Sequence, residues 1–393
     1  MRLHELHAKL GLRTHLLLGA TGSGKSSFIE ALAGKNHQLG ISGSTLESVT
    51  QDVQVFKVVN MEWKWVGGDS EPVLIVDTPG FSDSKMSEVE IVNKVNQWIK
   101  KHDRIDHIYY FCRITDTRIP GSAWRLMKII KSLGINPKGL KIITSMWDTI
   151  GTDGALKRAE GHFSQLRDVI WKDEIEEGAS IVKFENTQSS AIEILTGITY
   201  WAYVLSYTFG SQRNSLIAQL VFPELLDRIQ NSQQERQAYL DDRIRLLSNP
   251  DPDLESTLMH SHRDVDERLA NYIHQLVEFG TPPEGVNVNP QSIAYQSLLN
   301  ITLDSQKFVH TIEKALSQLP SLPSSTLRKT ELKKTLRVAI GDYITTYVSL
   351  HTLAAPPFGS PPFTPTVKLT TADHIKLKSL MKAKQLQLRW NAR

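Results

Sequence analysis

The chain has 393 residues, which is room for two or three domains, and its 40% hydrophobic and 22% charged residues are ordinary values for a folded protein. Its formal net charge of +3 is too small to indicate specific binding to nucleic acid. The sequence shows no long apolar run for a transmembrane helix, no secretory signal and no glycine for N-myristoylation. Because Cys112 is the single cysteine, no internal disulfide is possible, and we expect a cytoplasmic protein.

The first motif lies between an apolar run at 14–18, which predicts a strand, and helical spacing at 27–33. Residues 19–26 read GATGSGKS and match the phosphate-loop pattern G-x-x-x-x-G-K-[ST]. The predicted nucleotide-binding residues are Gly19, Ala20, Thr21, Gly22, Ser23, Gly24, Lys25, Ser26 and Ser27. Backbone N–H groups at the helix start would hold the phosphates, Lys25 would reach the β- and γ-phosphates, and Ser26 would bind Mg²⁺. The alternative is a glycine-rich turn that caps an ordinary helix.

The second motif follows an apolar run at 71–76, which is typical of a strand buried on both faces. Residues 77–80 read DTPG. Asp77 stands where a carboxylate would hold Mg²⁺ through water, and Gly80 can offer its backbone N–H to a γ-phosphate because no side chain blocks the approach. These residues are also common in plain turns, but on a second core strand they favour GTP as the nucleotide.

The third motif follows a buried-type strand at 140–145. GTPases place an aspartate at this point to accept hydrogen bonds from guanine, usually in the pattern [NT]-K-x-D. The four places are held here by Ser145, Met146, Trp147 and Asp148. Met146 keeps an apolar stem but loses the lysine charge, and Asp148 is the predicted guanine ligand, with a helix N-cap as the alternative. After a last strand at 181–185, Asn186 either touches the base edge or belongs to a turn and helix cap.

These pieces, GATGSGKSS, DTPGF, TSMWD and FENT, together resemble the fungal G-domain proteins. Those proteins are relatives of the immunity-associated GTPases, the chloroplast-import receptor GTPases and, more distantly, the septins. The resemblance covers residues 12–205 and implies a P-loop GTPase fold, Mg²⁺ and, often, nucleotide-dependent homodimers. It also implies a switch threonine and metal ligand at Thr50, with Thr45 as the runner-up.

Two further positions bear on catalysis. The stretch 113–118 resembles an arginine-rich segment near the nucleotide in the import receptors, so Arg118 either reaches a phosphate, in its own or a neighbouring chain, or is a solvated loop arginine. Small GTPases carry a water-orienting glutamine after the second motif, but this chain has Phe81 there, so we expect slow turnover. With Lys25, Thr50, Gly80 and Arg118 as candidate catalytic residues, we predict a slow GTPase or switch that binds GTP and GDP.

Two other functions start from the same motifs. A scaffold that binds GTP structurally and acts through its helical part is the first alternative, which Phe81 and Met146 keep open. A small-molecule or nucleic-acid kinase also begins with a phosphate loop, but the DTPG motif and the lack of an arginine-rich lid disfavour it. The sequence does not name an effector.

The order of predicted elements gives the fold class. Strands are predicted near 14–19, 53–60, 72–77, 106–112, 140–145 and 181–185, and helices near 25–33, 87–101, 121–133, 155–172 and 188–205. This alternation predicts an α/β fold of the P-loop NTPase type, a three-layer sandwich with a mainly parallel sheet. The strand near 53–60 partly alternates, as an edge strand would.

The second half predicts helices alone. Apolar residues from Leu216 to Ile229 have helical spacing, with Pro223 expected to kink or interrupt them, and helices follow near 236–247, 253–279, 290–318 and 328–353. The predicted organisation is a G domain at 1–208, a helical extension at 209–353, a proline-rich linker at 354–366 and a basic tail at 367–393. The linker is expected to be extended and mobile rather than a docking peptide. The tail is either a solvated, partly helical segment, which we favour, or a basic amphipathic helix that touches an anionic membrane or nucleic acid.

Overall fold

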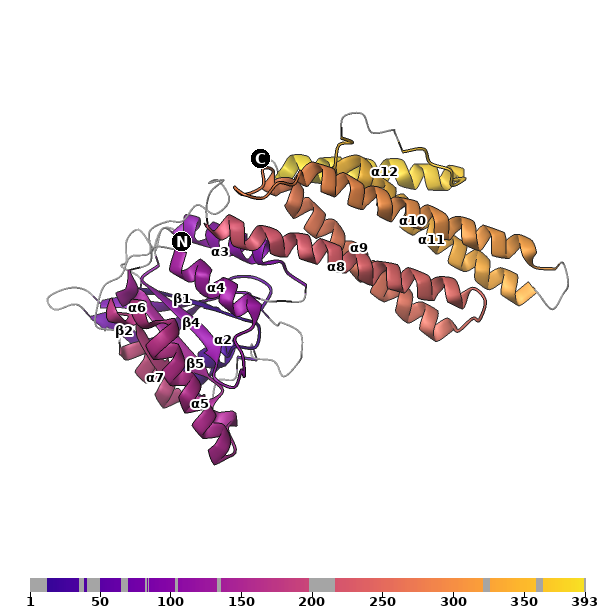
Figure 1. Cartoon of the computed structure of the whole chain (residues 1–393). Coiled ribbons are helices and arrows are strands. Elements are labelled where there is room, and N and C mark those ends of the chain that lie inside the picture. The colour runs from indigo at the N-terminus through magenta and orange to yellow at the C-terminus, as the bar shows by residue number, and fades with distance from the viewer. Residues whose placement is uncertain are drawn as a thin grey trace. The chain divides into compact units, whose positions relative to one another are not determined.

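The computed structural model describes residues 13–34, 39–40, 50–64, 70–81, 83, 85–102, 105–132, 136–197, 216–320, 326–357 and 363–391. The chain forms two compact units, Met1–Val221 and Phe222–Arg393 (Figure 1). Thr45 lies outside the described residues, so the structure does not compare it with Thr50. The predicted domain boundaries stay a prediction.

A six-stranded sheet forms the centre of the first unit, in the order β2-β3-β1-β4-β5-β6. The strands are β1 Arg13–Gly19, β2 Gln54–Lys64, β3 Ser70–Asp77, β4 His107–Arg113, β5 Leu140–Ser145 and β6 Ser180–Lys183. All neighbours pair in parallel except β2, which runs antiparallel to β3. Strand β2 lies at one edge of the sheet, the position that its alternation predicted. Because β1, β3 and β5 all end at one edge of the sheet, the three sequence motifs that follow them meet there.

Helices cover both faces of this sheet. They are α2 Lys25–Ala33, α3 Glu88–His102, α4 Gly121–Ser132, α5 Asp153–Gln165, α6 Lys172–Glu176 and α7 Gln188–Thr196. Helices α2 and α7 pack side by side, and Phe28 of α2 and Ile194 of α7 share a core cluster with Tyr109 of β4. Tyr110 points to the opposite face, where its ring lies 5.5 Å from that of Trp171, just before α6. The predicted α/β fold with a mainly parallel sheet is therefore confirmed.

Two predicted helices of this unit differ in the structure. The helix predicted at 155–172 is instead α5, a five-residue π-helical turn η3 (Leu166–Ile170) and α6, because Trp171 leaves the helix and buries its side chain. The helix predicted at 188–205 ends at Thr196, where the N–H of Gly197 caps it on the carbonyl of Glu193. Residues 198–205 lie outside the described part.

In its described residues the second unit consists of helices joined by turns and loops, without a strand. Its helices are α8 Leu216–Leu246, of which the part from Phe222 belongs to this unit, α9 Pro252–Phe279, α10 Pro290–Gln318, α11 Thr326–Leu353 and α12 Thr371–Asn391. Asp251 and Asn289 cap α9 and α10 by accepting backbone N–H groups, with a proline in each first turn. These caps fix where α9 and α10 begin, after the turns that follow α8 and α9.

Of the two effects expected at Pro223, a kink or an interruption, the interruption is wrong, because α8 is one helix of 31 residues that contains this proline. A proline costs a helix one backbone hydrogen bond and creates a steric clash, which is a penalty of about 3 kcal/mol. The buried side chains of Phe222, Leu225 and Ile229 flank it, and their burial offsets that loss.

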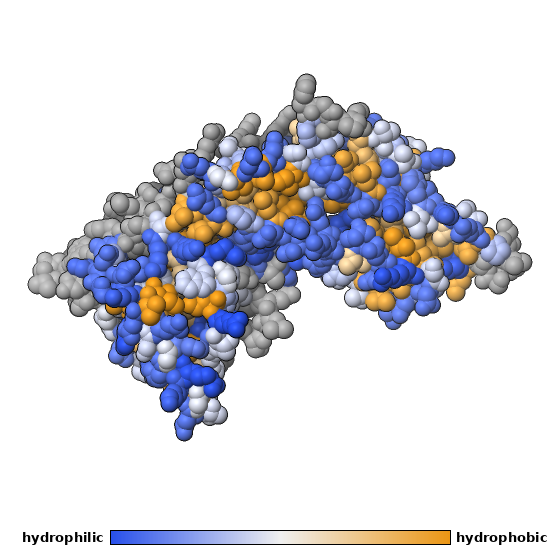
Figure 2. All heavy atoms as spheres, in the orientation of Figure 1, coloured by the Kyte–Doolittle hydropathy of each residue, from blue (hydrophilic) through white to orange (hydrophobic). Residues whose placement is uncertain are grey.

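Two described residues at the C-terminal end of the proline-rich stretch contact the helices of the second unit. Thr366 donates its backbone N–H to Gln306 of α10, and Phe363 packs against the same core cluster as Val309. The tail beyond it is helix α12, whose Leu377 and Leu380 also join this cluster. The face in Figure 2 mixes hydrophilic and hydrophobic side chains, and within the described residues no helix is long and apolar enough to cross a membrane.

Candidate nucleotide-binding site

The phosphate loop joins β1 to α2 and is held in shape by two glycines and by β5. Gly22 and Gly24 have φ angles of 73° and 92°, which side chains rarely tolerate. A Cβ atom on Gly24 would also lie 3.2 Å from the Cβ of Ser145. The hydroxyl of Ser145 donates to the carbonyl oxygen of Ser23 at 2.7 Å, which ties the loop to the end of β5. This gives the first residue of the third motif a positioning contact that the sequence did not reveal.

Lys25 is folded back into this loop. Its ammonium group donates to the carbonyl oxygens of Gly19 and Ala20, both at 3.2 Å, and the side chain is buried. Burial lowers the pKa of Lys25, while the carboxylates of Asp77 and Asp83 oppose that shift. A buried cation of this kind is stabilised further by an anion, which is what the phosphates of a nucleotide would supply.

Ser26, Thr50 and Asp77 meet beside Lys25. The hydroxyls of Ser26 and Thr50 each donate to Oδ2 of Asp77 at 3.1 Å, and the two hydroxyl oxygens lie 3.4 Å apart. Oδ1 of Asp77 is buried and has no hydrogen-bond partner among the described residues. Burial raises the pKa of Asp77, and Lys25 and the hydrogen bonds from both hydroxyls oppose this shift.

This donor set fits a magnesium ion. One carboxylate and two hydroxyls are the oxygen ligands that Mg²⁺ takes, together with water and phosphate oxygens. An unpartnered buried carboxylate oxygen is costly in a folded protein, and a cation would remove that cost. The metal ligands predicted from the sequence are therefore brought together, although their role stays a prediction.

The second motif closes against the phosphate loop. Phe81 donates its backbone N–H to the carbonyl of Gly19 and accepts from the N–H of Thr21, so the two loops pair like neighbouring strands. A Cβ atom on Gly80 would lie 2.5 Å from Cα of Thr21, a distance that requires glycine here. The ring of Phe81 is buried and offers no polar group to a water molecule.

Asp148 and Asn186 meet at the ends of β5 and β6. The amide of Asn186 donates to Oδ2 of Asp148 at 3.0 Å, and both residues are exposed. Asn186 and Met146 are the two non-glycine residues with positive φ in the described part, at 57° and 66°. Such angles are uncommon outside glycine and mark positions that a function can require.

Asp148 and Asn186 were each also expected as possible helix caps, but neighbouring residues cap the helices instead. Thr152 caps α5 by accepting the N–H of Ala155, and Thr187 caps α7 by accepting the N–H of Ser190. Asp148 lies instead in η2 Trp147–Thr149, where its side chain caps nothing. Both side chains are thus available to a ligand.

Of the two arginines in the stretch 113–118, Arg113 rather than Arg118 lies next to the phosphate loop. Arg118 is exposed and has no hydrogen bond or ion pair with the described residues. Nη1 of Arg113 would lie 3.9 Å from a Cβ atom on Gly22, and its Nε pairs with Asp116 at 3.1 Å. Arg113 comes to the phosphate loop because β4 pairs in parallel with β1, with Phe111 opposite Gly19.

The comparisons with known proteins identify this part of the chain. Residues 14–143 match a family model described as 50S ribosome-binding GTPase, a range that includes the phosphate loop and the DTPG motif. The first unit is a G domain. The chain is in this sense a GTP-binding protein with a G domain and a helical second unit.

Two further comparisons concern the whole chain. No curated protein matches the chain. Among solved structures, a crystal structure of a mutation variant of SsGBP is similar over 49% of this chain, with 15% sequence identity and a TM-score of 0.28. The match spans 59% of that protein, which is less than two thirds of its length.

Proposed function

We propose that the G domain binds GTP and GDP together with Mg²⁺ and works as a slow GTPase that switches between two states. The observation that supports this proposal is the meeting of Ser26, Thr50 and Asp77, three oxygen donors from three separate segments, beside the ammonium group of Lys25. A phosphate loop alone serves many nucleotide enzymes. A threonine from the segment before β2 that reaches the metal ligands is what a γ-phosphate-sensing switch requires.

In this proposal each group has a role. The backbone of Gly22–Ser26 and the ammonium group of Lys25 hold the phosphates, and the N–H of Gly80 senses the γ-phosphate. Asp148 accepts the N1–H and 2-amino hydrogens of guanine, and Asn186 orients that carboxylate through its 3.0 Å hydrogen bond. Adenine offers no such donor pair, so the carboxylate selects against it.

Slow intrinsic hydrolysis follows from Phe81. The side chain directly after the second motif is the phenyl ring of Phe81, which cannot orient water, so we expect a rate on the order of 10⁻⁴–10⁻³ per second, as for unassisted small GTPases. Faster turnover would need a group from a partner or a second copy, and the exposed Arg118 is the candidate for a homodimer. We propose a cytoplasmic location, with the helical unit as the part that meets an effector.

The second candidate is a scaffold that GTP stabilises without hydrolysis. Two observations favour it: the main chain of Phe81 is already bonded to the phosphate loop, and Met146 replaces the base-contacting lysine. Single-turnover measurements on dilute monomer separate the two functions. Slow hydrolysis supports the switch, no hydrolysis supports the scaffold, and fast hydrolysis contradicts both.

Calorimetric titration with GTPγS, GDP and ATPγS in the presence of Mg²⁺ tests the binding proposal. We expect both guanine nucleotides to bind more tightly than ATPγS. The Lys25→Ala variant should lose this binding, since it lacks the cation that faces the phosphates. Equal affinity for ATPγS, or unchanged binding by the variant, would contradict the proposal.

A further inference from the structure

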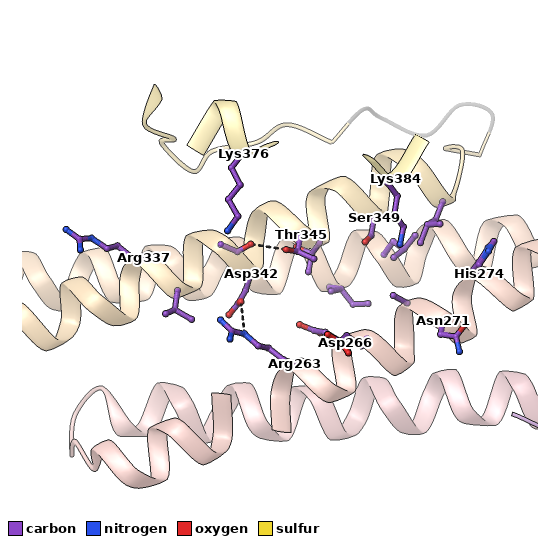
Figure 3. A pocket seen from close by; sticks show the side chains of 18 residues that line it. Arg263, Asp266, Asn271, His274, Arg337, Asp342, Thr345, Ser349, Lys376 and Lys384 are labelled. Carbon is purple, nitrogen blue, oxygen red and sulfur yellow. Dashed lines mark hydrogen bonds and ion pairs between the residues drawn. The ribbon is translucent and has the colours of Figure 1, made fainter. Parts of the chain in front are cut away.

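A cavity of about 760 Å³ lies within the second unit, between helices α9, α10, α11 and α12 (Figure 3). This volume falls within the range of about 300–1,000 Å³ that small-molecule sites occupy. Its apolar lining includes Ala270 of α9, Leu298 and Ile301 of α10, and Val338 of α11. The cavity is separate from the nucleotide site, since every residue that lines it belongs to the helical unit.

Two of the carboxylates that line this cavity already face arginines. Asp342 lies 3.6 Å from Nε of Arg263 and 3.6 Å from Nη1 of Arg243, while Asp266 accepts a 2.6 Å hydrogen bond from Arg236. The charges of Asp266 and Asp342 are therefore compensated within the bundle. The remaining lining acid, Glu267, is exposed on α9.

The two lysines that line the cavity, unlike Asp266 and Asp342, have no ion-pair partner among the described residues. Lys376 and Lys384 reach from α12 toward α11, and neither forms an ion pair with a residue in the described ranges (Figure 3). Nζ of Lys376 would lie 3.3 Å from a Cβ atom on Gly341, so it rests against α11 at a place where a larger residue would push it away. Ser349 of α11 also lines the cavity and adds a hydroxyl donor.

The spacing of these two lysines limits the ligand. They are eight positions apart on one helix, which separates their backbones by about 12 Å along its axis. In Figure 3 the two side chains point to separate places on α11, so one carboxylate would contact both only if the lysines changed rotamer. An occupant that satisfies both lysines as they stand needs two anionic groups, one near each end, and an apolar middle to cover Ala270 and Val338, which are partly exposed.

We propose that this cavity binds an elongated organic dianion with an apolar middle, of the α,ω-dicarboxylate type. One carboxylate pairs with Lys376 and the other with Lys384 and the Ser349 hydroxyl. The hydrocarbon middle covers the apolar side chains of α9, α10 and α11. The nucleotide site takes no part in this binding.

Calorimetry on the full chain with dodecanedioate and dodecanoate tests the proposal, because the two probes share their length and differ in one charge. We expect dodecanedioate to bind about fivefold more tightly, the gain that one partly exposed ion pair supplies. Lys376→Ala and Lys384→Ala should each remove this advantage. Lys378→Ala and Lys382→Ala, on the same helix but outside the cavity lining, should keep it.

Two further variants locate the bound probe. Lys25→Ala should bind dodecanedioate as the unaltered chain does, which excludes the phosphate loop as the site. Ala270→Trp fills the cavity without changing charge and should abolish binding, with circular dichroism as the check that the bundle is intact. Equal affinity for the two probes, equal effects of all four lysine variants, or no saturable binding would overturn the proposal and leave the cavity as a water-filled gap.

Discussion

At the phosphate end of the nucleotide site, Ser26, Thr50 and Asp77 are held within 3.4 Å of one another, and Thr50 and Asp77 are buried. At the base end, Asp148 and Asn186 meet through one hydrogen bond on exposed surface. The phosphate end is fixed by backbone contacts that allow almost no other residue. The base end depends on a few side chains, so its motif can vary, as Met146 shows, while the fold is unaffected.

The largest effect should come from the tightest contact of the phosphate end. Gly80→Ala places a Cβ atom 2.5 Å from Cα of Thr21, so the two loops must separate. Overpacking of this kind costs about 1–3 kcal/mol, and we expect the affinity for GDP with Mg²⁺ to fall by about 100-fold. Fluorescence titration with a labelled GDP measures this change.

Gly151→Ala is the matched control, because nothing lies within 4 Å of a Cβ atom at that glycine. The control should bind GDP normally and unfold at the same temperature as the unaltered chain. If Gly80→Ala also bound GDP normally, the closed contact between the two loops would not be part of the binding geometry.

A smaller and more selective effect is expected at the base end. Asp148→Ala removes the carboxylate that would accept two hydrogen bonds from guanine, and such charged hydrogen bonds contribute about 1.5–3 kcal/mol. GDP affinity should fall about 30-fold while ADP affinity stays the same. Competition titrations with both nucleotides measure this preference. Asp153→Ala, an exposed acid in the first turn of α5, should leave it unchanged.

The phosphate end should also respond to acid. Burial raises the pKa of Asp77, so this carboxyl takes up a proton at a higher pH than an ordinary aspartate does. Mg²⁺ needs the charged form, so the gain in GDP affinity from Mg²⁺ over EDTA should decline by up to about tenfold per pH unit below that pKa. Asp77→Asn should show no gain at any pH, and a gain that persisted in this variant would remove Asp77 from the metal site.

The difference between the two ends also decides what could be read from the sequence. The strands, the phosphate loop and the DTPG motif are each defined by a short stretch of sequence. The fold class could therefore be predicted from the sequence, and it agrees with the structure. Thr50 could not be separated from Thr45, since the length of a loop does not say which residue turns inward. The distance of 3.1 Å between Thr50 and Asp77 is a property of the folded chain.

The features that the sequence missed depend on partners far away in the chain. Pro223 predicts a kink or a break, but the packing of Phe222 and Leu225 keeps α8 continuous. Arg113 lies beside Gly22 because β4 is the neighbour of β1, an order that the sequence pattern alone did not provide. The cavity below Lys376 and Lys384 likewise exists only once α12 packs on α11.

The smallest effect is expected at Met146, which stands where the usual motif has a lysine. It tests whether this residue lowers the affinity for the base. Met146→Lys restores a cation beside the base while keeping the apolar stem at the same φ of 66°. A cation close to an aromatic ring contributes about 0.5–1 kcal/mol at an exposed site, so the affinity for GDP should rise about two- to fivefold. Met146→Leu, which keeps the stem without charge, should not change it. A rise far above fivefold would mean that the base end, and not the buried phosphate end, limits nucleotide affinity in this chain.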